Sequence, residues 1–329
     1  MRKSTCGDMR TSVLGFGCGS VLGRVGRGAS LRAMNTAWNE GITLFDTARS
    51  YGFGEAEAVL GEFLRDKRQQ AIVATKFGID PQTPGTFKRM VLPAARAALS
   101  MKVLGIRKLV RHGGLHETVF GQFSVKVLRA SIETSLRQLR TDYVDILYLH
   151  EAPVDAMHQQ ELLAELDALK RAGKVLRVGL YANSAVIAEG MANGPATLGA
   201  MQFGANPFDP VAAGFAERNR RGALLIGNHP FGSKERVARI AVTLAAVSRD
   251  ESVPEELRHK LRRADWQVLL EAIFGVVLNT IGAHALVFSM IQTEHLHANA
   301  RAVESCRFTG PELALLHERL LKAPAPGEP

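Results

Sequence analysis

The alternation of short apolar runs with longer amphipathic stretches is the feature that most constrains the fold of this chain. Runs that are apolar throughout are typical of parallel strands buried on both faces, and amphipathic stretches are typical of helices that cover a sheet. The repeated order therefore predicts βα units and a parallel sheet. The predicted strands begin near Val13, Ile42, Ile72, Val144, Val175, Gly199, Ala223 and Ala285.

Helices are predicted between these strands, where apolar residues recur at helical spacing. Ser30 and Ser124 precede such stretches and are predicted N-caps, since a serine hydroxyl accepts a hydrogen bond from the first turn of a helix. Three glycines follow such stretches, where a left-handed residue is favoured, and these are Gly41, Gly173 and Gly222. The predicted helices cover residues 30–40, 55–64, 126–139, 159–172 and 212–221.

Polar side chains stand at or after the ends of successive apolar runs. Asp46, Lys76 and His150 each end such a run, and Tyr51 lies five residues after Asp46. Taken singly, each has an ordinary structural explanation, such as a helix cap or a packed aromatic ring. Because the strands of an α/β barrel all end on one face, where such barrels place their active sites, we expect the four side chains to converge there.

These four residue types together suit proton transfer. A tyrosine hydroxyl has a pKa of about 10 and is a poor acid at neutral pH without a cation nearby. We expect the Lys76 ammonium to lower the pKa of Tyr51, and Asp46 to hold that ammonium in place. His150 is expected to hydrogen-bond a substrate carbonyl oxygen and to polarise it as negative charge develops. The set therefore suits reduction of a carbonyl group.

Longer segments around these residues match the pattern of a known family. They are 41–52 (GITLFDTARSYG), 54–57 (GEAE), 75–77 (TKF) and 147–150 (LYLH). By these motifs the chain resembles the aldo-keto reductases, from about residue 12 to residue 305. The resemblance implies a (β/α)8 barrel and an NAD(P)H-dependent reduction of an aldehyde or ketone to an alcohol, or the reverse. It implies that Tyr51 is the general acid and base.

The resemblance also implies where the cofactor, NADPH or NADH, binds. Gln202 matches the glutamine that usually holds the nicotinamide carboxamide, whereas Tyr181 stands where the family usually has a serine and is a candidate ring beside the nicotinamide. Basic residues that usually bind the 2′-phosphate of NADPH are missing from the stretch 288–299, so NADPH is only slightly favoured. The predicted cofactor-binding residues are Gly19, Tyr181, Asn183, Gln202, Asn228, Ser289, His295 and Asn299.

Two stretches are too long to be simple connections between a strand and a helix. Residues 78–122 follow the third predicted strand, begin with a turn-rich segment and are expected to contribute a lid. Residues 228–283 follow the seventh predicted strand and contain two apolar periodic stretches, over 254–263 and 266–278, that predict helices. Both long stretches are expected to shape the substrate pocket.

Composition and length restrict the binding partners, the location and the domain organisation that we expect. The formal net charge of +9 fits attraction of an anionic dinucleotide, and no nucleic-acid-binding motif accompanies it. No apolar stretch of signal-peptide or transmembrane length occurs, so a cytoplasmic location without membrane contact is predicted. The three cysteines and the histidines have no metal-ligand spacing, so no metal is predicted. We expect one barrel domain over residues 1–322 and a disordered tail over 323–329.

Three kinds of function stay open on the sequence alone. The leading hypothesis is a reductase acting on a small-molecule carbonyl compound, or an alcohol dehydrogenase running the same reaction backwards. The altered residues near the carboxamide leave room for a non-redox lyase or isomerase, and for a cofactor-binding regulatory protein with little turnover. The intact set of four argues against pure regulation, because binding alone has no need of it. Neither the substrate nor the oligomeric state follows from the sequence.

Overall fold

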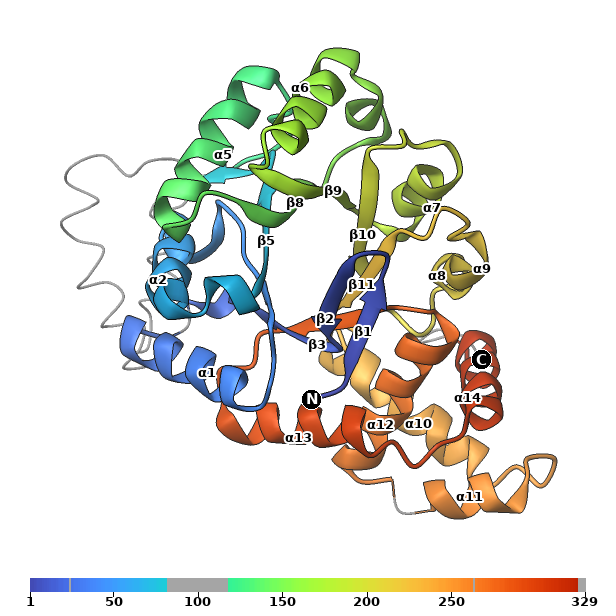
Figure 1. The fold of residues 1–329 in the computed structure, drawn as a ribbon. Coiled ribbons are helices and arrows are strands. Elements are labelled where there is room, and N and C mark those ends of the chain that lie inside the picture. Colours follow the sequence, from blue (N-terminus) through green and yellow to red (C-terminus); the bar gives the residue numbers. More distant parts are fainter. Residues whose placement is uncertain (24, 82–117, 263, 325–329) are drawn as a thin grey trace.

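The computed structural model describes residues 1–23, 25–81, 118–262 and 264–324, and a closed barrel of eight parallel strands forms its centre (Figure 1). Neighbouring strands pair in the order β10-β11-β12-β3-β4-β5-β8-β9, and β9 closes onto β10. Each predicted strand is present, which confirms the (β/α)8 barrel. The strands are β3 (Leu14–Gly17), β4 (Leu44–Asp46), β5 (Ile72–Phe77), β8 (Val144–His150), β9 (Val175–Tyr181), β10 (Leu198–Gly204), β11 (Leu224–Asn228) and β12 (Ala285–Phe288).

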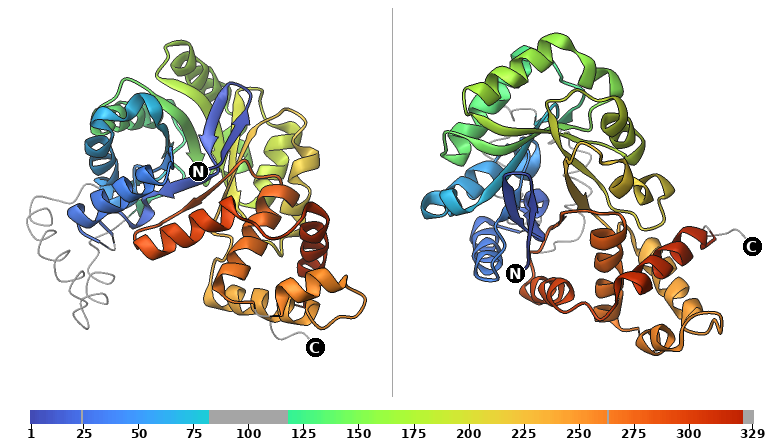
Figure 2. Two further views of the ribbon diagram at one scale, coloured as in Figure 1. Left: turned by 60° about the horizontal axis from the view of Figure 1, so that its bottom comes forward. Right: turned by 45° about the vertical axis from the view of Figure 1, so that its right-hand side comes forward.

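Helices surround the outside of the barrel (Figures 1 and 2). Their apolar faces pack against the strands, and their polar faces point to solvent. The helices are α1 (Arg27–Asn39), α2 (Ala56–Phe63), α5 (Val125–Leu139), α6 (Gln160–Arg171), α7 (Ser184–Asn193), α8 (Pro210–Ala213), α9 (Phe215–Arg218), α10 (Lys234–Val247), α11 (Glu255–Leu261), α12 (Trp266–Gly275), α13 (Thr293–Glu304) and α14 (Gly310–Lys322). None of the helices in the described part of the chain is both long and apolar enough to cross a membrane.

The predicted helix ends are right at most positions and wrong at one. Ser124 caps α5 by accepting a hydrogen bond from the backbone N–H of Val127. The three glycines, Gly41, Gly173 and Gly222, have positive φ, as expected. Ser30 is not a cap, because α1 begins at Arg27 and the Ser30 hydroxyl donates instead to the carbonyl of Gly26. A serine hydroxyl can bond to the carbonyl four residues earlier, so its position alone does not mark a helix start.

Other differences from the predicted elements are local. The predicted helix over 212–221 is split into α8 and α9, with Gly214 between them. Helix α7 is absent from the predicted set, although Asn183 provides a capping side chain at its start. The hairpin of β1 (Lys3–Cys6) and β2 (Met9–Ser12) is also absent from that set. Its apolar residues Cys6 and Met9 join the core cluster inside the barrel, so the hairpin plugs one end of it (Figure 1).

The two long stretches extend the barrel in different ways. Residues 82–117 of the first lie outside the described residues, and its two ends pair as the short antiparallel strands β6 (Asp80–Pro81) and β7 (Thr118–Val119). The second stretch carries α10, α11 and α12, so both helices predicted there are confirmed. Helix α12 is buried along almost its whole length and continues into a π-helical turn, Val276–Thr280. The predicted tail lies outside the described residues from 325 onward.

Candidate functional site

The barrel brings together the four residues predicted to act in proton transfer. Asp46 ends β4, Lys76 lies near the end of β5, and His150 ends β8, and these strands are neighbours in the barrel. The Lys76 ammonium donates to Asp46 Oδ1 at 2.5 Å and to the carbonyl of Thr47 at 2.8 Å. Lys76 and Asp46 are 1% and 4% exposed, so solvent hardly reaches this ion pair. We refer to Asp46, Tyr51, Lys76 and His150 as the tetrad.

The rings of Tyr51 and His150 meet edge to face. Their centroids lie 6.1 Å apart with an interplanar angle of 86°, and the Lys76 ammonium lies 5.0 Å from the centroid of the Tyr51 ring. Burial lowers the pKa of His150 to about 3, and the nearby Lys76 charge adds to this effect. His150 is therefore neutral at physiological pH, and its buried Nδ1 has no hydrogen-bond partner in the described part of the protein. A neutral imidazole can serve as a hydrogen-bond donor without bringing a second positive charge.

The pKa of Tyr51 moves in the direction opposite to the prediction. It is raised, first by burial, then by the negative charge of Asp46, with smaller contributions from Cys18 and Glu151. The expectation that Lys76 lowers this pKa is wrong, because the ammonium lies over the ring and its charge is paired with Asp46. Tyr51 is therefore a neutral phenol across the physiological pH range, which is the form that holds a proton to donate.

Gln202 lies directly beside the charged pair. Its Nε2 donates to Asp46 Oδ2 at 3.1 Å, so the two oxygens of Asp46 bind Lys76 and Gln202 respectively. The other amide atom, Oε1, is buried and has no hydrogen-bond partner among the described residues. A buried acceptor without a partner costs free energy, which a bound N–H donor would recover. The site therefore fits the carboxamide N–H of a nicotinamide.

Tyr181 and Asn228 are the last residues of the strands β9 and β11. Tyr181 ends β9, its ring centroid lies 5.3 Å from that of His150, and the Lys76 ammonium lies 5.8 Å from it. Burial is the main cause of the raised pKa of Tyr181, and a hydrogen bond with the Asn228 side chain opposes that rise. Asn228 ends β11, and β10 lies between β9 and β11 in the barrel.

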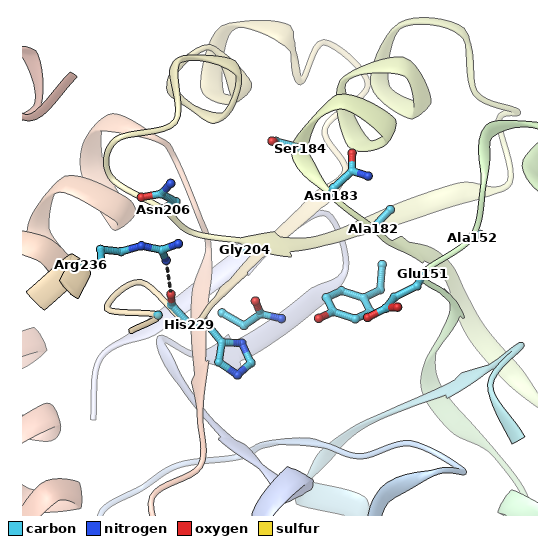
Figure 3. A pocket seen from close by; sticks show the side chains of 12 residues that line it. Glu151, Ala152, Ala182, Asn183, Ser184, Gly204, Asn206, His229 and Arg236 are labelled. Carbon is cyan, nitrogen blue, oxygen red and sulfur yellow. Dashed lines mark hydrogen bonds between the residues drawn. The ribbon is translucent and has the colours of Figure 1, made fainter. Parts of the chain in front are cut away.

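A cavity of about 700 Å3 opens beside these residues (Figure 3). Three of the predicted cofactor-binding residues, Tyr181, Asn183 and Asn228, line it, and the Asn183 oxygen also caps α7. Its described lining consists of Glu151, Ala152, Tyr181, Ala182, Asn183, Ser184, Gly204, Asn206, Asn228, His229, Gly232 and Arg236.

Glu151 and Arg236 in this lining were missed by the sequence-based prediction. The Arg236 guanidinium donates to the carbonyl of His229 at 3.1 Å. Gly232, with a φ of 56°, leaves the space that the guanidinium occupies, since a Cβ there would collide with it. The signal in the sequence was a glycine in the loop after β11, four residues before an arginine in the first turn of α10, and only the structure shows that the two are in contact.

The remaining predicted cofactor residues are Gly19, Ser289, His295 and Asn299. The Ser289 hydroxyl donates to the carbonyl of Gly17 at 3.2 Å. Gly19 is exposed, and a Cβ placed on it would lie 3.8 Å from Ser289 Oγ and 3.9 Å from the Tyr51 ring. His295 is exposed in the first turn of α13, and Asn299 is buried one turn further along. These residues do not line the 700 Å3 cavity.

Comparison with known proteins identifies the family of this chain. A model of the family described as "Aldo/keto reductase family" matches residues 13–221. The chain belongs to this family. An aldo-keto reductase of Bacillus subtilis is 27% identical over 164 residues, which are 49% of this chain and 39% of that protein. An aryl-alcohol dehydrogenase of Pestalotiopsis microspora is 27% identical over 201 residues, which are 60% of this chain and 44% of that protein.

Among solved structures, the holo form of an aldo-keto reductase from Bacillus halodurans superposes with a TM-score of 0.69. It is 22% identical, and the match covers 100% of this chain and 99% of that one. This likeness establishes the fold. The chain matches less than half the length of the curated relatives named above. Within the described residues, no group of three or more His, Cys, Asp and Glu side chains is placed to hold a metal ion.

Proposed function

We propose that this member of the aldo-keto reductase family is an NAD(P)H-dependent oxidoreductase that reduces an aldehyde or ketone to an alcohol, or catalyses the reverse. The observation that carries the proposal is the buried Lys76–Asp46 pair at the carboxyl ends of β4 and β5, with the Tyr51 and His150 rings against it. Burying two charges costs free energy that folding alone does not require. A reaction that takes place next to the Lys76–Asp46 pair explains why these two charges are buried.

The roles of the tetrad follow from its geometry. Tyr51, neutral at physiological pH, donates its proton to the carbonyl oxygen as that oxygen becomes an alkoxide. Neutral His150 donates a hydrogen bond to the same oxygen and stabilises the developing charge. Lys76, held by Asp46, packs its ammonium against the Tyr51 ring and so positions the proton donor. A reduced nicotinamide, when bound, supplies the hydride.

Residues on both sides of the tetrad are proposed to hold the cofactor. Gln202 Oε1, buried and unpartnered in the described structure, accepts from the carboxamide, and the Tyr181 ring packs beside the nicotinamide. The proposed set also includes Gly19, Asn183, Asn228, Ser289, His295 and Asn299. Arg236 adds a guanidinium in the cavity, which suits a phosphate oxygen but does not distinguish NADPH from NADH.

Titration of the purified protein with NADPH and, separately, with NADH tests the first requirement. We expect micromolar binding of at least one, followed by intrinsic fluorescence, and oxidation of that cofactor when an aromatic aldehyde is added. Binding of neither cofactor would exclude a redox function. The aldehyde class is chosen because one relative is named as an aryl-alcohol dehydrogenase.

Tyr51→Phe tests the role of the proton donor. The variant keeps the ring and loses only the hydroxyl, so cofactor affinity should stay near that of the wild type while turnover falls at least about 100-fold. Tyr143→Phe is the control, since Tyr143 lies next to β8 at the opposite end from His150. Turnover that survives in Tyr51→Phe would exclude this tyrosine as the acid.

A regulatory protein that binds the cofactor with little turnover is the second candidate. Tyr181 favours it, because this tyrosine ends β9 at the place where the family usually presents a serine to the carboxamide. Tight cofactor binding without oxidation across a panel of aldehydes and ketones would support this candidate over the reductase.

A further inference from the structure

Two formally charged side chains of opposite sign occupy different sides of the 700 Å3 cavity. Glu151 lies on one side of the cavity, and the Arg236 guanidinium lies on the other side next to His229 (Figure 3). Glu151 directly follows His150 in the chain, and its side chain is exposed at the edge of the cavity. The described lining therefore carries one negative charge on the residue next to the tetrad member His150.

The backbone holds Glu151 in an uncommon conformation. Its φ is 53°, in the left-handed region that residues with a Cβ rarely adopt. Its N–H donates to the carbonyl of Tyr181 at 2.7 Å, which joins the ends of β8 and β9. Glycine would satisfy the same backbone at lower cost. A glutamate kept in this conformation at the edge of a site points to a role for its side chain.

The charge of Glu151 acts on both tyrosines of the site. The pKa of Tyr51 is raised first by burial, and Glu151 is one of the negatively charged groups that add to the rise. The pKa of Tyr181 is likewise raised mainly by burial, with a smaller contribution from Glu151. Asp46 is paired with Lys76, whereas Glu151 takes part in none of the ion pairs found among the described residues. Its negative charge is therefore available to a ligand.

We infer that Glu151 determines specificity, favouring carbonyl substrates that carry a positive charge and disfavouring those that carry a carboxylate. The inference rests on the proposed function, because it assigns a substrate class to the same site. A carboxylate at the edge of the cavity attracts a cation and repels an anion, with a strength that falls as solvent and salt screen it. Selectivity of this kind combines an attractive and a repulsive element.

Three para-substituted benzaldehydes test the inference. They are para-trimethylammoniobenzaldehyde, its uncharged isostere para-tert-butylbenzaldehyde, and para-carboxybenzaldehyde. The measured quantity is kcat/KM for each aldehyde, in the wild type and in Glu151→Gln, with whichever nicotinamide cofactor binds. Comparing the ratio of two aldehydes between two proteins cancels their different intrinsic reactivities.

We expect the ratio of kcat/KM for the cationic aldehyde to that for its isostere to fall about tenfold in Glu151→Gln, and the ratio for the carboxylate to rise. Glu251→Gln is the matched control, because it removes the same charge from the exposed turn between α10 and α11. Both ratios should equal those of the wild type in this control. Ratios that do not change in Glu151→Gln overturn the inference and leave the proposed function standing.

Failure of the proposed function gives a different result, namely no turnover of any of the three aldehydes by the wild type. Binding of the same aldehydes, followed by quenching of intrinsic fluorescence, then decides the role of Glu151. Preferential binding of the cationic aldehyde over its isostere, lost in Glu151→Gln, supports the inference. Equal binding of the two, or binding of neither, overturns it.

Discussion

The carboxyl end of the barrel has a buried floor and an open rim, which hold their polar groups in different ways. The floor consists of Asp46, Lys76 and Gln202, and the rim consists of Glu151, Tyr181, Asn228 and Arg236. Each floor residue is at most 4% exposed, and both oxygens of Asp46 are bound by the other two. Tyr181 and Asn228 end strands, Glu151 directly follows β8, and Arg236 lies in the first turn of α10. The Glu151 N–H and the Arg236 guanidinium donate to backbone carbonyls.

This difference indicates which residues of the site can be substituted without loss of the fold. A buried ion pair tolerates no loss of a partner, because the remaining charge stays without solvent. Loop residues on a rigid scaffold can change with little cost to the fold, and they are where binding properties reside. The floor keeps the residue types that the family resemblance implies, whereas the rim carries the tyrosine and the two charges that are particular to this chain. Chemistry is therefore assigned to the floor, and specificity to the rim.

Lys76→Met gives the largest expected effect and tests the floor directly. The variant leaves the Asp46 carboxylate buried with only Gln202 as a partner, so the free energy of unfolding should fall by about 3 to 5 kcal/mol. Urea unfolding, followed by circular dichroism, measures this difference. Lys67→Met is the matched control, because Lys67 pairs with Asp66, whose side chain is 76% exposed. The control should change stability by less than about 1 kcal/mol. Equal losses in the two variants would contradict a distinct floor.

The floor was largely predictable from the sequence. Parallel strands end on one face of a barrel, so Asp46, Lys76 and His150 at the ends of three apolar runs had to meet. The direction of the Tyr51 pKa was not predictable, because it depends on how deeply the ring is buried and on Lys76 being paired with Asp46. The order of these opposing contributions is a property of the packed structure.

The rim was predicted only in part. Tyr181, Asn183 and Asn228 were found through the family resemblance, and all three line the cavity. Glu151 stands next to His150 in the sequence, yet its left-handed φ is invisible there. Arg236 lies in a basic, amphipathic stretch where a solvent-facing role is the ordinary expectation, and its place in the cavity depends on the space left by Gly232. Glu151 and Arg236 are recognised only in the structure, because no local sequence pattern requires a charged residue at either position.

The pH dependence of stability tests whether His150 belongs with the buried floor. Burial, and then the Lys76 charge, lower its pKa from 6.5 to about 3. A depressed pKa in the folded state means that stability is fully present above the unfolded pKa of 6.5 and is lost as the pH falls. This histidine should cost about 2 kcal/mol of unfolding free energy between pH 6.5 and 4.5.

His150→Gln removes that titration, so its stability should fall less steeply than that of the wild type over the same pH interval. His259→Gln, on the solvent side of α11, is the control and should keep the wild-type slope. Urea unfolding at a series of pH values gives both slopes. Parallel curves for the wild type and His150→Gln would show that His150 is solvated like a rim residue.

Glu151→Gly gives the smallest expected effect, and its sign is opposite to that of the floor variant. Glycine adopts a φ of 53° without the clash that a Cβ brings, so the variant should be more stable than the wild type by about 0.5 to 1 kcal/mol. Glu151→Ala removes the same carboxylate but keeps the Cβ, so the difference between the two variants isolates the backbone contribution. If Glu151→Gly is no more stable than Glu151→Ala, the left-handed backbone carries no penalty, and the glutamate needs no functional reason to be there. A gain in stability together with a loss of charge selectivity would mean that Glu151 supports selectivity while it lowers the stability of the fold. Every floor residue, in contrast, contributes both to stability and to the chemistry of the site.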